Sequence, residues 1–263
     1  MSEMVRYEVE SNVATVTLNR PDAMNTMSSE LLAGVAASLE DASEDPRVRV
    51  VVLTGNGRAF CAGGDLNKFA AGAGQEIGVG TRIAQLRTAM RTSQLLAEMP
   101  KPTIAAINGA CAGAGLSWAC AADLRYCVES ARFNTAFLTA GLSGDFGGSW
   151  TLPRIVGPAK AREMYLLPEK FGGQRAEQLG LVNRCVPDAE LGVAVAEVAA
   201  RLVDSAPLAL AAVKANFNDS LTDDFATHLD LEASRHARCQ YTADAREAAA
   251  AFLEKRKPAF LGE

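Results

Sequence analysis

The succession of strand, glycine-rich loop and helix, which occurs twice in the first half of this chain, constrains the fold most strongly. Two short apolar runs, at 48–53 and 103–107, have the character of buried strands, and a loop rich in small residues follows each of them. Strands that are joined by crossover helices form parallel sheets in nearly all known cases. The sequence therefore predicts an α/β fold with a parallel sheet at its centre.

The remaining pattern predicts a β/α core that is followed by a helical segment. Residues 5–18 alternate apolar and polar side chains around Ser11-Asn12, which is typical of a β-hairpin. Ser28 precedes an amphipathic run and is expected to cap a helix. Further expected elements are a helix at 81–97, strands at 124–128 and 181–186, and helices at 148–156, 159–167, 174–180, 188–203, 207–217 and 222–254. We divide the chain into a core of residues 1–200 and a C-terminal helical segment of residues 201–263.

Composition and charge exclude several classes of function. The chain has 263 residues, of which 49% are hydrophobic, and a net charge of -5, whereas nucleic-acid binders usually present a basic face. No apolar run is long enough to span a membrane, and the start has no pattern of a signal peptide. The six cysteines contain no CxxC pair, which favours reduced thiols. We therefore expect a cytoplasmic protein with no partner among nucleic acids or membranes.

Two loops of small residues, at 60–66 and 108–116, are the strongest candidates for a functional site. Each lies between a strand and a helix, where small side chains let the backbone approach a ligand and let N–H groups point outward. Two such donors that point to one oxygen form an oxyanion hole. The glycines of the second loop match a dinucleotide-binding fingerprint poorly, because its third glycine is missing.

Seven segments of the chain match one known pattern in order. They are 20–27 (RPDAMNTM), 62–66 (AGGDL), 107–115 (INGACAGAG), 123–125 (DLR), 147–154 (GGSWTLPR), 180–182 (GLV) and 251–260 (AFLEKRKPAF). In these segments the chain resembles the crotonase (enoyl-CoA hydratase/isomerase) superfamily over nearly its whole length. The resemblance implies a core of ββα spiral repeats and a C-terminal helical segment that forms trimers, which can pair into hexamers.

The resemblance also implies an acyl-coenzyme A thioester as substrate, with coenzyme A as part of it and no further cofactor or metal. Carried over to this chain, the two oxyanion donors are the amides of Ala62 and Ala114, which would bind the thioester oxygen and stabilise an enolate. Residues expected to contact the pantetheine arm, the acyl group or the phosphates are Ala23, Met24, Asn25, Gly64, Asp65, Leu66, Gly113, Ser117, Phe137, Leu142 and Lys255. Asp65 also suits a helix cap.

The catalytic acids are where this chain departs from the hydratases of the family. Those enzymes carry two glutamates that activate water, and Ser117 and Phe137 stand at the two positions here. Asp145 remains, two residues before a Gly-Gly pair, and this arrangement resembles the branch of the ring-1,2-epoxyphenylacetyl-CoA isomerase and enoyl-CoA isomerases. A carboxylate in this loop also resembles chlorobenzoyl-CoA dehalogenase, whose tryptophan partner is replaced here by Phe137. A helix cap is the structural alternative for Asp145.

Isomerisation of an enoyl-CoA double bond is the leading hypothesis, with Asp145 as the proton shuttle, because one carboxylate can remove a proton at one carbon and return it at another. An apolar surrounding of Phe137, Leu138, Leu142 and Phe146 would raise the pKa of such a base. Three alternatives remain open at this point. They are hydration with an acid that the sequence does not reveal, another crotonase chemistry such as C–C cleavage or ring formation, and acyl-CoA binding without turnover.

Overall fold

The computed structural model describes residues 3–65 and 77–263 and shows an α/β protein. Its main sheet has six strands in the order β1-β2-β3-β5-β7-β10, and all neighbours are parallel except the β1–β2 hairpin. The strands are β1 (Val5–Glu10), β2 (Val13–Leu18), β3 (Val50–Gly55), β5 (Thr103–Ile107), β7 (Leu124–Val128) and β10 (Arg184–Val186). The predicted hairpin and parallel sheet are confirmed.

A second, smaller sheet runs in the order β4-β6-β8-β9 and was not predicted. Its strands are β4 (Ala59–Cys61), β6 (Ala110–Ala112), β8 (Arg132–Asn134) and β9 (Phe171–Gly172). Strands β3, β5 and β7 are each followed along the chain by one of these short strands, which gives the expected ββα repeats. Segments of two or three residues are too short to show an alternation of side chains, so sequence periodicity could not reveal them.

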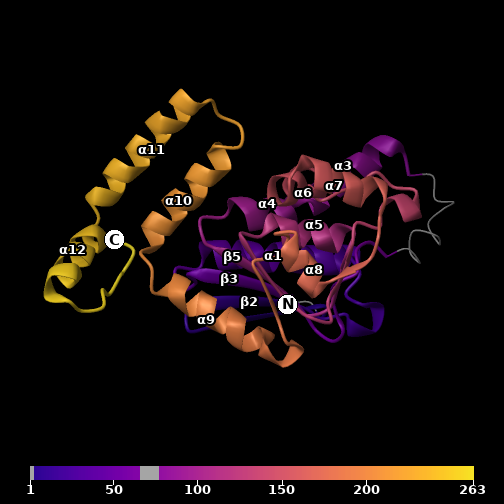
Figure 1. Ribbon diagram of the computed structural model, residues 1–263, viewed down its shortest axis with the longest axis horizontal. Helices are drawn as coiled ribbons and strands as arrows, with labels where there is room; N and C mark the ends of the chain where they lie inside the picture. The colour runs from indigo at the N-terminus through magenta and orange to yellow at the C-terminus, as the bar shows by residue number, and fades with distance from the viewer. Residues whose placement is uncertain (1–2, 66–76) are drawn as a thin grey trace.

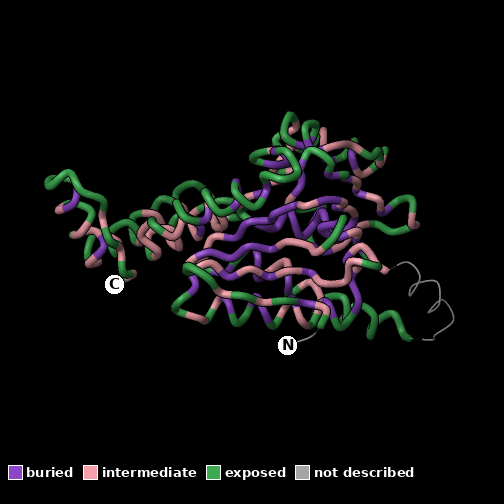
Figure 2. Tube along the Cα trace, turned by 90° about the horizontal axis from the view of Figure 1, so that it is seen from below, coloured by how far each residue is buried: buried purple, intermediate pink, exposed green. Residues whose placement is uncertain are grey.

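Helices cover both sides of the main sheet (Figure 1), and Figure 2 shows its buried strands in the middle of the molecule. The helices of this part are α1 (Ser29–Glu44), α3 (Val79–Ala89), α4 (Arg91–Glu98), α5 (Ala114–Ala121), α6 (Gly148–Val156), α7 (Pro158–Leu166), α8 (Gly173–Gln178) and α9 (Leu191–Val203). Ser28 caps α1 as predicted, since its Oγ accepts a hydrogen bond from the Leu31 amide at 3.2 Å. All eight residues of α5 are buried, so the N-terminus of this helix lies inside the core.

Three expected elements differ from the structure. The helix expected at 81–97 is divided at Met90 into α3, which buries no side chain, and α4, which packs on the core. The strand expected at 181–186 begins at Arg184, because the Leu181 amide donates to the Ala176 carbonyl at 2.9 Å and closes α8 instead. The helix expected at 222–254 is two helices, and Thr242 caps the second.

The C-terminal helices α10 (Pro207–Asp219), α11 (Phe225–Gln240) and α12 (Ala243–Glu254) extend away from the two sheets (Figure 1). The expected domain boundary at residue 200 falls inside α9, which packs on β3, β5 and β7, and the division into domains stays a prediction. None of the described helices is long and apolar enough to cross a membrane.

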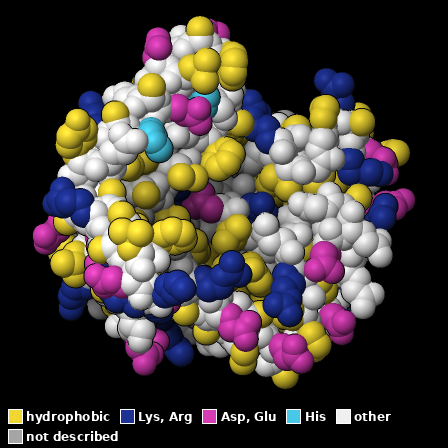
Figure 3. Space-filling model, turned by 60° about the vertical axis from the view of Figure 1, so that its left-hand side comes forward, with side chains coloured by type: hydrophobic (Ala, Val, Ile, Leu, Met, Phe, Trp, Pro, Cys, Tyr) yellow, Lys and Arg dark blue, Asp and Glu magenta, His cyan; other side chains and the backbone are white. Residues whose placement is uncertain are grey.

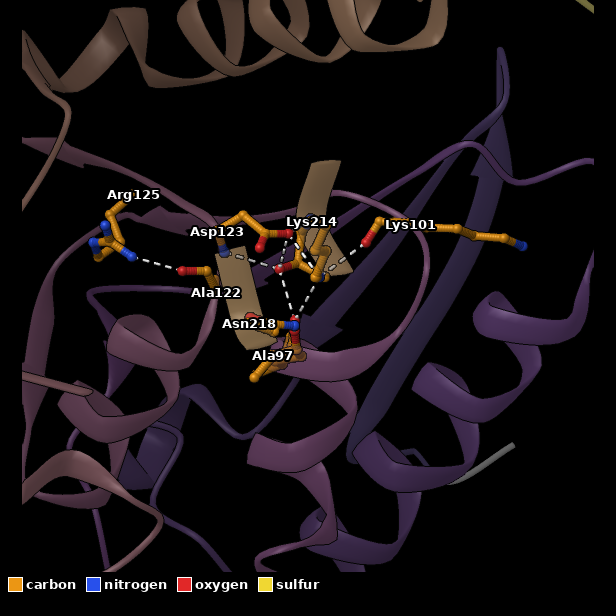
Figure 4. A network of polar contacts seen from close by, with 9 residues as sticks. Ala97, Lys101, Ala122, Asp123, Arg125, Lys214 and Asn218 are labelled. Carbon is orange, nitrogen blue, oxygen red and sulfur yellow. Dashed lines mark hydrogen bonds and ion pairs between the residues drawn. The ribbon is translucent and has the colours of Figure 1, made fainter. Parts of the chain in front are cut away.

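One buried cation joins α10 to the core (Figure 4). Lys214 is 8% exposed, and its Nζ lies 2.7 Å from Asp123 Oδ2 and 3.1 Å from the carbonyl oxygens of Leu96 and Lys101. Asp123 also accepts hydrogen bonds from the amide and hydroxyl of Thr103, at the start of β5. This network ties the first C-terminal helix to the edge of the sheet where two strands begin.

Candidate active site

The segment that follows β2 is held by one buried side chain. Asn25 is fully buried, its Oδ1 accepts from the Arg20 amide at 2.8 Å, and its Nδ2 donates to the carbonyls of Asn56 and Ala59 at 3.0 and 2.8 Å. Asn25 and the preceding Met24 both have left-handed backbones, with φ of 54° and 52°. Asparagine tolerates this conformation better than other non-glycine residues. The side chain of Asn25 thus shapes the loop from within, while Met24 is partly exposed.

The predicted oxyanion donor Ala62 needs a correction. Its amide donates to the Met24 carbonyl at 3.1 Å and is therefore not open to a ligand in this structure. At Gly64, two residues later, the backbone N–H points in a different direction. The Gly63 carbonyl accepts from the Met27 amide at 2.8 Å, and in a trans peptide the N–H of the next residue points the opposite way. The Gly64 N–H therefore points away from Met27, and a Cβ built on Gly64 would meet no atom of the described residues within 4 Å.

Asp65 is held by an ion pair beside this loop. The Arg20 guanidinium donates to its carboxylate at 2.9 Å and also to the hydroxyl of Thr26 at 2.9 Å. The carboxylate is mostly buried, so the pair fixes the end of the first loop to the segment after β2. Leu66, which we expected to line the acyl side, lies outside the described residues, as does the helix that Asp65 was expected to cap.

The second loop leads directly into α5 and confirms the expected position of the Ala114 amide at a helix N-terminus. The Gly113 carbonyl accepts from the Ser117 amide at 3.1 Å, so the Ala114 N–H of the same peptide points out of the helix. Gly113 has φ 52° and ψ −125°, a conformation that favours glycine. The two loops touch, since a Cβ on Gly63 would lie 3.4 Å from the Ala114 nitrogen.

An aromatic side chain covers the start of α5. The ring of Phe137 lies 3.8 Å from the position of a Cβ on Gly113 and stacks on Tyr165, with ring centroids 5.9 Å apart. The Leu142 amide donates to the Phe137 carbonyl at 2.9 Å and closes a short turn. Leu142 itself is 39% exposed, so it lies at the outer side of this segment. Phe137 is thus placed where the sequence predicted an apolar wall.

The Asp145 loop, which we define as residues 141–147, has an unusual backbone. Gly144, Phe146 and Gly147 have φ of 110°, 51° and 78°. Phe146 is buried and packs edge-to-face on Trp118 of α5, with centroids 5.9 Å apart. A left-handed non-glycine residue costs of order 1–3 kcal/mol, and the packing of Phe146 compensates for it. The loop is therefore fixed to the same helix that carries the Ala114 amide.

The carboxylate of Asp145 has no described partner of opposite charge. Its Oδ1 is buried and has no hydrogen-bond partner in the described part of the chain, and burial raises the pKa of the carboxyl group from the ordinary 3.8 to about 6. The alternative of a helix cap is wrong, because α6 begins after Gly147 with no side-chain cap. Only the main-chain carbonyl of Asp145 accepts a bond from this helix, from the Gly148 amide at 3.2 Å. A carboxylate kept in this state is suited to exchange protons near neutral pH.

Sequence reasoning missed Tyr165, which the structure places in the same region. It comes from α7, lies in none of the matching segments, and packs between the Asp145 loop and α5. Ser117, at one hydratase glutamate position, is 2% exposed and lies beside the Tyr165 hydroxyl against Gly148. Nothing in the sequence around Tyr165 indicates that its side chain lies next to the Asp145 loop.

One expected coenzyme contact, Lys255, lies apart from this region. Lys255 is exposed at the end of α12, on the arm that extends away from α5 and α6 (Figure 1). Within one chain it is not brought to the other candidates. Ala23, by contrast, borders a groove of about 760 Å³ that opens beside the first loop. Its lining holds two cations, Arg6 and Arg20, and two carboxylates, Glu3 and Asp22.

The chain matches known proteins over nearly its whole length. A model of the family described as enoyl-CoA hydratase/isomerase matches residues 8–263. The chain belongs to the enoyl-CoA hydratase/isomerase family. It is 39% identical to a probable enoyl-CoA hydratase of Rhodobacter capsulatus, with 98% of each chain covered. It is 36% identical to the 1,2-epoxyphenylacetyl-CoA isomerase of Escherichia coli K12 over the full length of both.

Solved structures of the enoyl-CoA hydratase/isomerase family share the fold. A putative enoyl-CoA hydratase from Streptomyces coelicolor matches with a TM-score of 0.93 and 36% identity, covering 99% of this chain and 94% of that one. An enoyl-CoA hydratase from Polaromonas matches with a TM-score of 0.92 and 32% identity, covering 97% of this chain and 99% of that one. Membership in this family makes the chain an enzyme of enoyl-CoA thioesters, while its relatives bear the names of both hydratases and isomerases.

Proposed function

We propose that this enzyme moves the double bond of an enoyl-CoA thioester, with Asp145 as its single base. The observation that carries the proposal is the state of the Asp145 carboxylate, which is partly buried, has one oxygen without a hydrogen bond and has a pKa raised to about 6. The two positions at which hydratases of the family carry glutamates hold Ser117 and Phe137 here. A single carboxylate suits a proton transfer between two carbons, whereas addition of water usually needs a second group.

The amides of Gly64 and Ala114 are the oxyanion donors in this proposal. Both N–H groups point away from the hydrogen bonds of their neighbours, and their loops touch at Gly63. Gly64 thereby replaces Ala62, whose amide is bound to Met24. Two backbone donors that are fixed before the substrate arrives stabilise the enolate oxygen without reorganisation, and losing one such donor costs about 100–1000-fold in rate.

The proposed reaction conserves all atoms of the substrate. The Asp145 carboxylate removes a proton from C2 of a 3-enoyl-CoA, and the electrons pass to the thioester oxygen as a dienolate. The amides of Gly64 and Ala114 bind that oxygen while its charge is present. Asp145 then returns the proton to C4, which leaves the conjugated 2-enoyl-CoA and a carboxylate ready for another cycle.

The test compares wild type with Asp145→Asn, using a 3-enoyl-CoA and following the absorbance of the conjugated product. Asparagine keeps the shape of the side chain but cannot accept the proton, so we expect a loss of at least about 100-fold. Asp230→Asn, which changes an exposed carboxylate on α11, is the matched control and should retain full activity. Equal activity of Asp145→Asn and wild type would refute the assignment. Hydration of 2-enoyl-CoA by wild type would favour the hydratase alternative.

Binding of the coenzyme portion is proposed for the groove beside Ala23, whose lining holds Arg6 and Arg20 together with Glu3 and Asp22. Arg20 is paired with Asp65, so Arg6 is the side chain proposed to contact a phosphate. Arg6→Ala should then raise KM without changing kcat, because it would remove binding that is the same in ground and transition states. Isothermal titration with coenzyme A measures the same loss directly. An unchanged KM and affinity would place the phosphates elsewhere.

We further propose that copies of the chain assemble as a homotrimer or hexamer through the C-terminal helices. Figure 3 shows hydrophobic side chains exposed around the two histidines of α11. Large apolar residues that are at least 44% exposed on this arm include Leu208, Val213, Phe217, Phe225, Leu229, Phe252 and Leu253. Apolar surface of this extent is typical of an interface. Light scattering of the purified protein should give about three or six times the chain mass of 27.7 kDa.

A further inference from the structure

Tyr165 contacts both halves of the proposed catalytic centre. Its ring edge lies 3.2 Å from the position of a Cβ on Gly144, the residue directly before Asp145. Its hydroxyl oxygen lies 2.5 Å from the position of a Cβ on Gly148, at the start of α6. A side chain at either glycine would collide with it. The backbone on both sides of Asp145 is thus built around this tyrosine.

The hydroxyl of Tyr165 also reaches α5. Ser117 Oγ lies 2.3 Å from the same Cβ position on Gly148, and the two hydroxyls hydrogen-bond to each other. Ser117 Oγ in turn lies 3.4 Å from the Gly113 carbonyl, whose peptide carries the Ala114 N–H. A chain of polar contacts therefore runs from Tyr165 to the peptide that we propose as an oxyanion donor.

We propose that Tyr165 is a positioning residue for the isomerisation. Its ring fixes the Asp145 loop, its hydroxyl fixes that loop relative to the first turn of α5, and the same hydroxyl adds a local dipole beside the base. The inference rests on the proposed function, since it assigns Tyr165 a part in the same site. The tyrosine takes no proton in this scheme and acts through Asp145 and the Ala114 peptide.

Electrostatics support this placement. Burial, with smaller contributions from Cys120 and from the charge of Asp145, raises the pKa of Tyr165 to about 12, and the hydrogen bond with Ser117 acts in the opposite direction. The hydroxyl is therefore neutral at working pH and senses the charge of the base. The other titratable group that acts on Tyr165 is the thiol of Cys120 on α5, whose own pKa is raised to about 11 by burial. Among the described residues, no charged group pairs with Asp145.

Tyr165→Phe tests the proposal, because it removes the hydroxyl and keeps the ring that stacks on Phe137. We expect kcat for a 3-enoyl-CoA to fall about tenfold, as for the loss of one hydrogen bond, while KM stays within about twofold. The acid limb of the kcat–pH profile should move upward by about half a pH unit or more, since the carboxylate loses a polar neighbour. Gly148→Ala, whose methyl group would displace both hydroxyls, should shift the limb in the same direction.

Tyr126→Phe on β7 is the matched control, because it removes a partly buried hydroxyl of the main sheet and should leave both kcat and the pH profile unchanged. Wild-type kcat and pH profile in Tyr165→Phe would overturn the proposal. A lower melting temperature with an unchanged pH profile would reduce Tyr165 to a packing residue and would overturn it as well. If wild type itself does not isomerise 3-enoyl-CoA, the proposed function fails, and this outcome is distinct from both others.

Discussion

At the scale of single residues, the proposed chemistry depends on an acid that has no partner of opposite charge among the described residues. Asp145 is flanked by residues with left-handed backbones, and its buried Oδ1 has no hydrogen-bond partner among the described residues. The neighbouring Asp65 shows the contrast, because Arg20 neutralises it at 2.9 Å. Two aspartates of one site region thus have different surroundings, because one is paired with a cation and the other has a pKa raised by burial.

Activity should depend on pH through this carboxyl group. Asp145 must be ionised to accept a proton, and its pKa is about 6. The rate of 3-enoyl-CoA isomerisation should therefore rise about tenfold per pH unit below pH 6 and level off above about pH 7. Measuring kcat across this range checks the expectation. A profile that stays flat down to about pH 4.5 would show that another group limits the rate.

The same carboxyl group should lower the stability of the enzyme at neutral pH. Its folded pKa of about 6 lies above the ordinary 3.8, so the native state binds the proton more tightly than the unfolded state does. Its stabilising contribution is complete below about pH 4 and is lost as the pH rises through 6. Asp145→Asn should thus gain about 1 kcal/mol over wild type at pH 8, after allowance for solvent screening, and nothing at pH 4. Urea denaturation of both proteins at the two pH values measures this difference.

The sequence indicates some of these residues and not others, for a physical reason. Asp145 stands in a motif, and the position of the Ala114 amide follows from a helix that begins after a Gly-rich loop. The choice between Ala62 and Gly64 depends on which way each peptide points, and small residues at both positions leave that direction undetermined. Tyr165 reaches the site through tertiary packing of α7, which no local pattern encodes.

At the scale of elements, the loop after β2 has a conformation that is fixed by side-chain hydrogen bonds. Asn25 makes three hydrogen bonds with its side chain, to the backbone of residues 20, 56 and 59, and so joins β2, β3 and β4 at one point. In this arrangement the Met24 carbonyl accepts a hydrogen bond from the Ala62 amide. The first oxyanion loop therefore receives its shape from a side chain that lies in a different segment.

Asn25→Ala should destabilise the protein by about 2–4 kcal/mol, because it removes three buried hydrogen bonds and leaves their backbone partners unsatisfied. Asn12→Ala is the matched control. Asn12 also has a left-handed backbone, but it is exposed and its side chain donates one hydrogen bond, to the Arg47 carbonyl. The Asn12→Ala variant should lose about 1 kcal/mol of unfolding free energy. Similar losses for both variants in thermal unfolding would mean that backbone strain, and not the buried network, dominates at Asn25.

The elements themselves follow from the sequence where periodicity is long enough. The hairpin, β5, β7 and most helices are predicted well, whereas the four short strands of the second sheet are not. The breaks at Met90 and Tyr241 interrupt helical patterns without a proline or glycine, so they arise from the packing of two helices in different directions. Local helix propensity therefore does not predict these two breaks.

At the scale of the whole molecule, the core and the C-terminal arm are joined through the Lys214 network. Burial lowers the pKa of this lysine, and the negative charge of Asp123 acts in the opposite direction. The lysine is buried while the Asp123 carboxylate is 31% exposed, and removing the lysine would leave that carboxylate and two carbonyl oxygens without their shared partner. The network therefore fixes how α10 leaves the core.

Lys214→Met should cost about 3 kcal/mol of unfolding free energy and should make the connection between α9 and α10 sensitive to protease. Lys257→Met is the matched control, since Lys257 forms an exposed pair with Asp204 and should contribute less than about 1 kcal/mol. Denaturant titrations and limited proteolysis of both variants provide the comparison. Equal stability of the two would show that α10 is held by apolar packing alone.

The left-handed residues around Asp145 have a consequence for how this scaffold can change its chemistry. The Asp145 loop is attached to the core at Phe146 and Tyr165, while the oxyanion amides belong to two other loops. If Asp145 is the base, as we propose, it can be exchanged by replacing a few residues at 141–147 while the two loops that carry the proposed oxyanion amides stay unchanged. In such an architecture, replacing one short loop can introduce a new reaction without changing the fold.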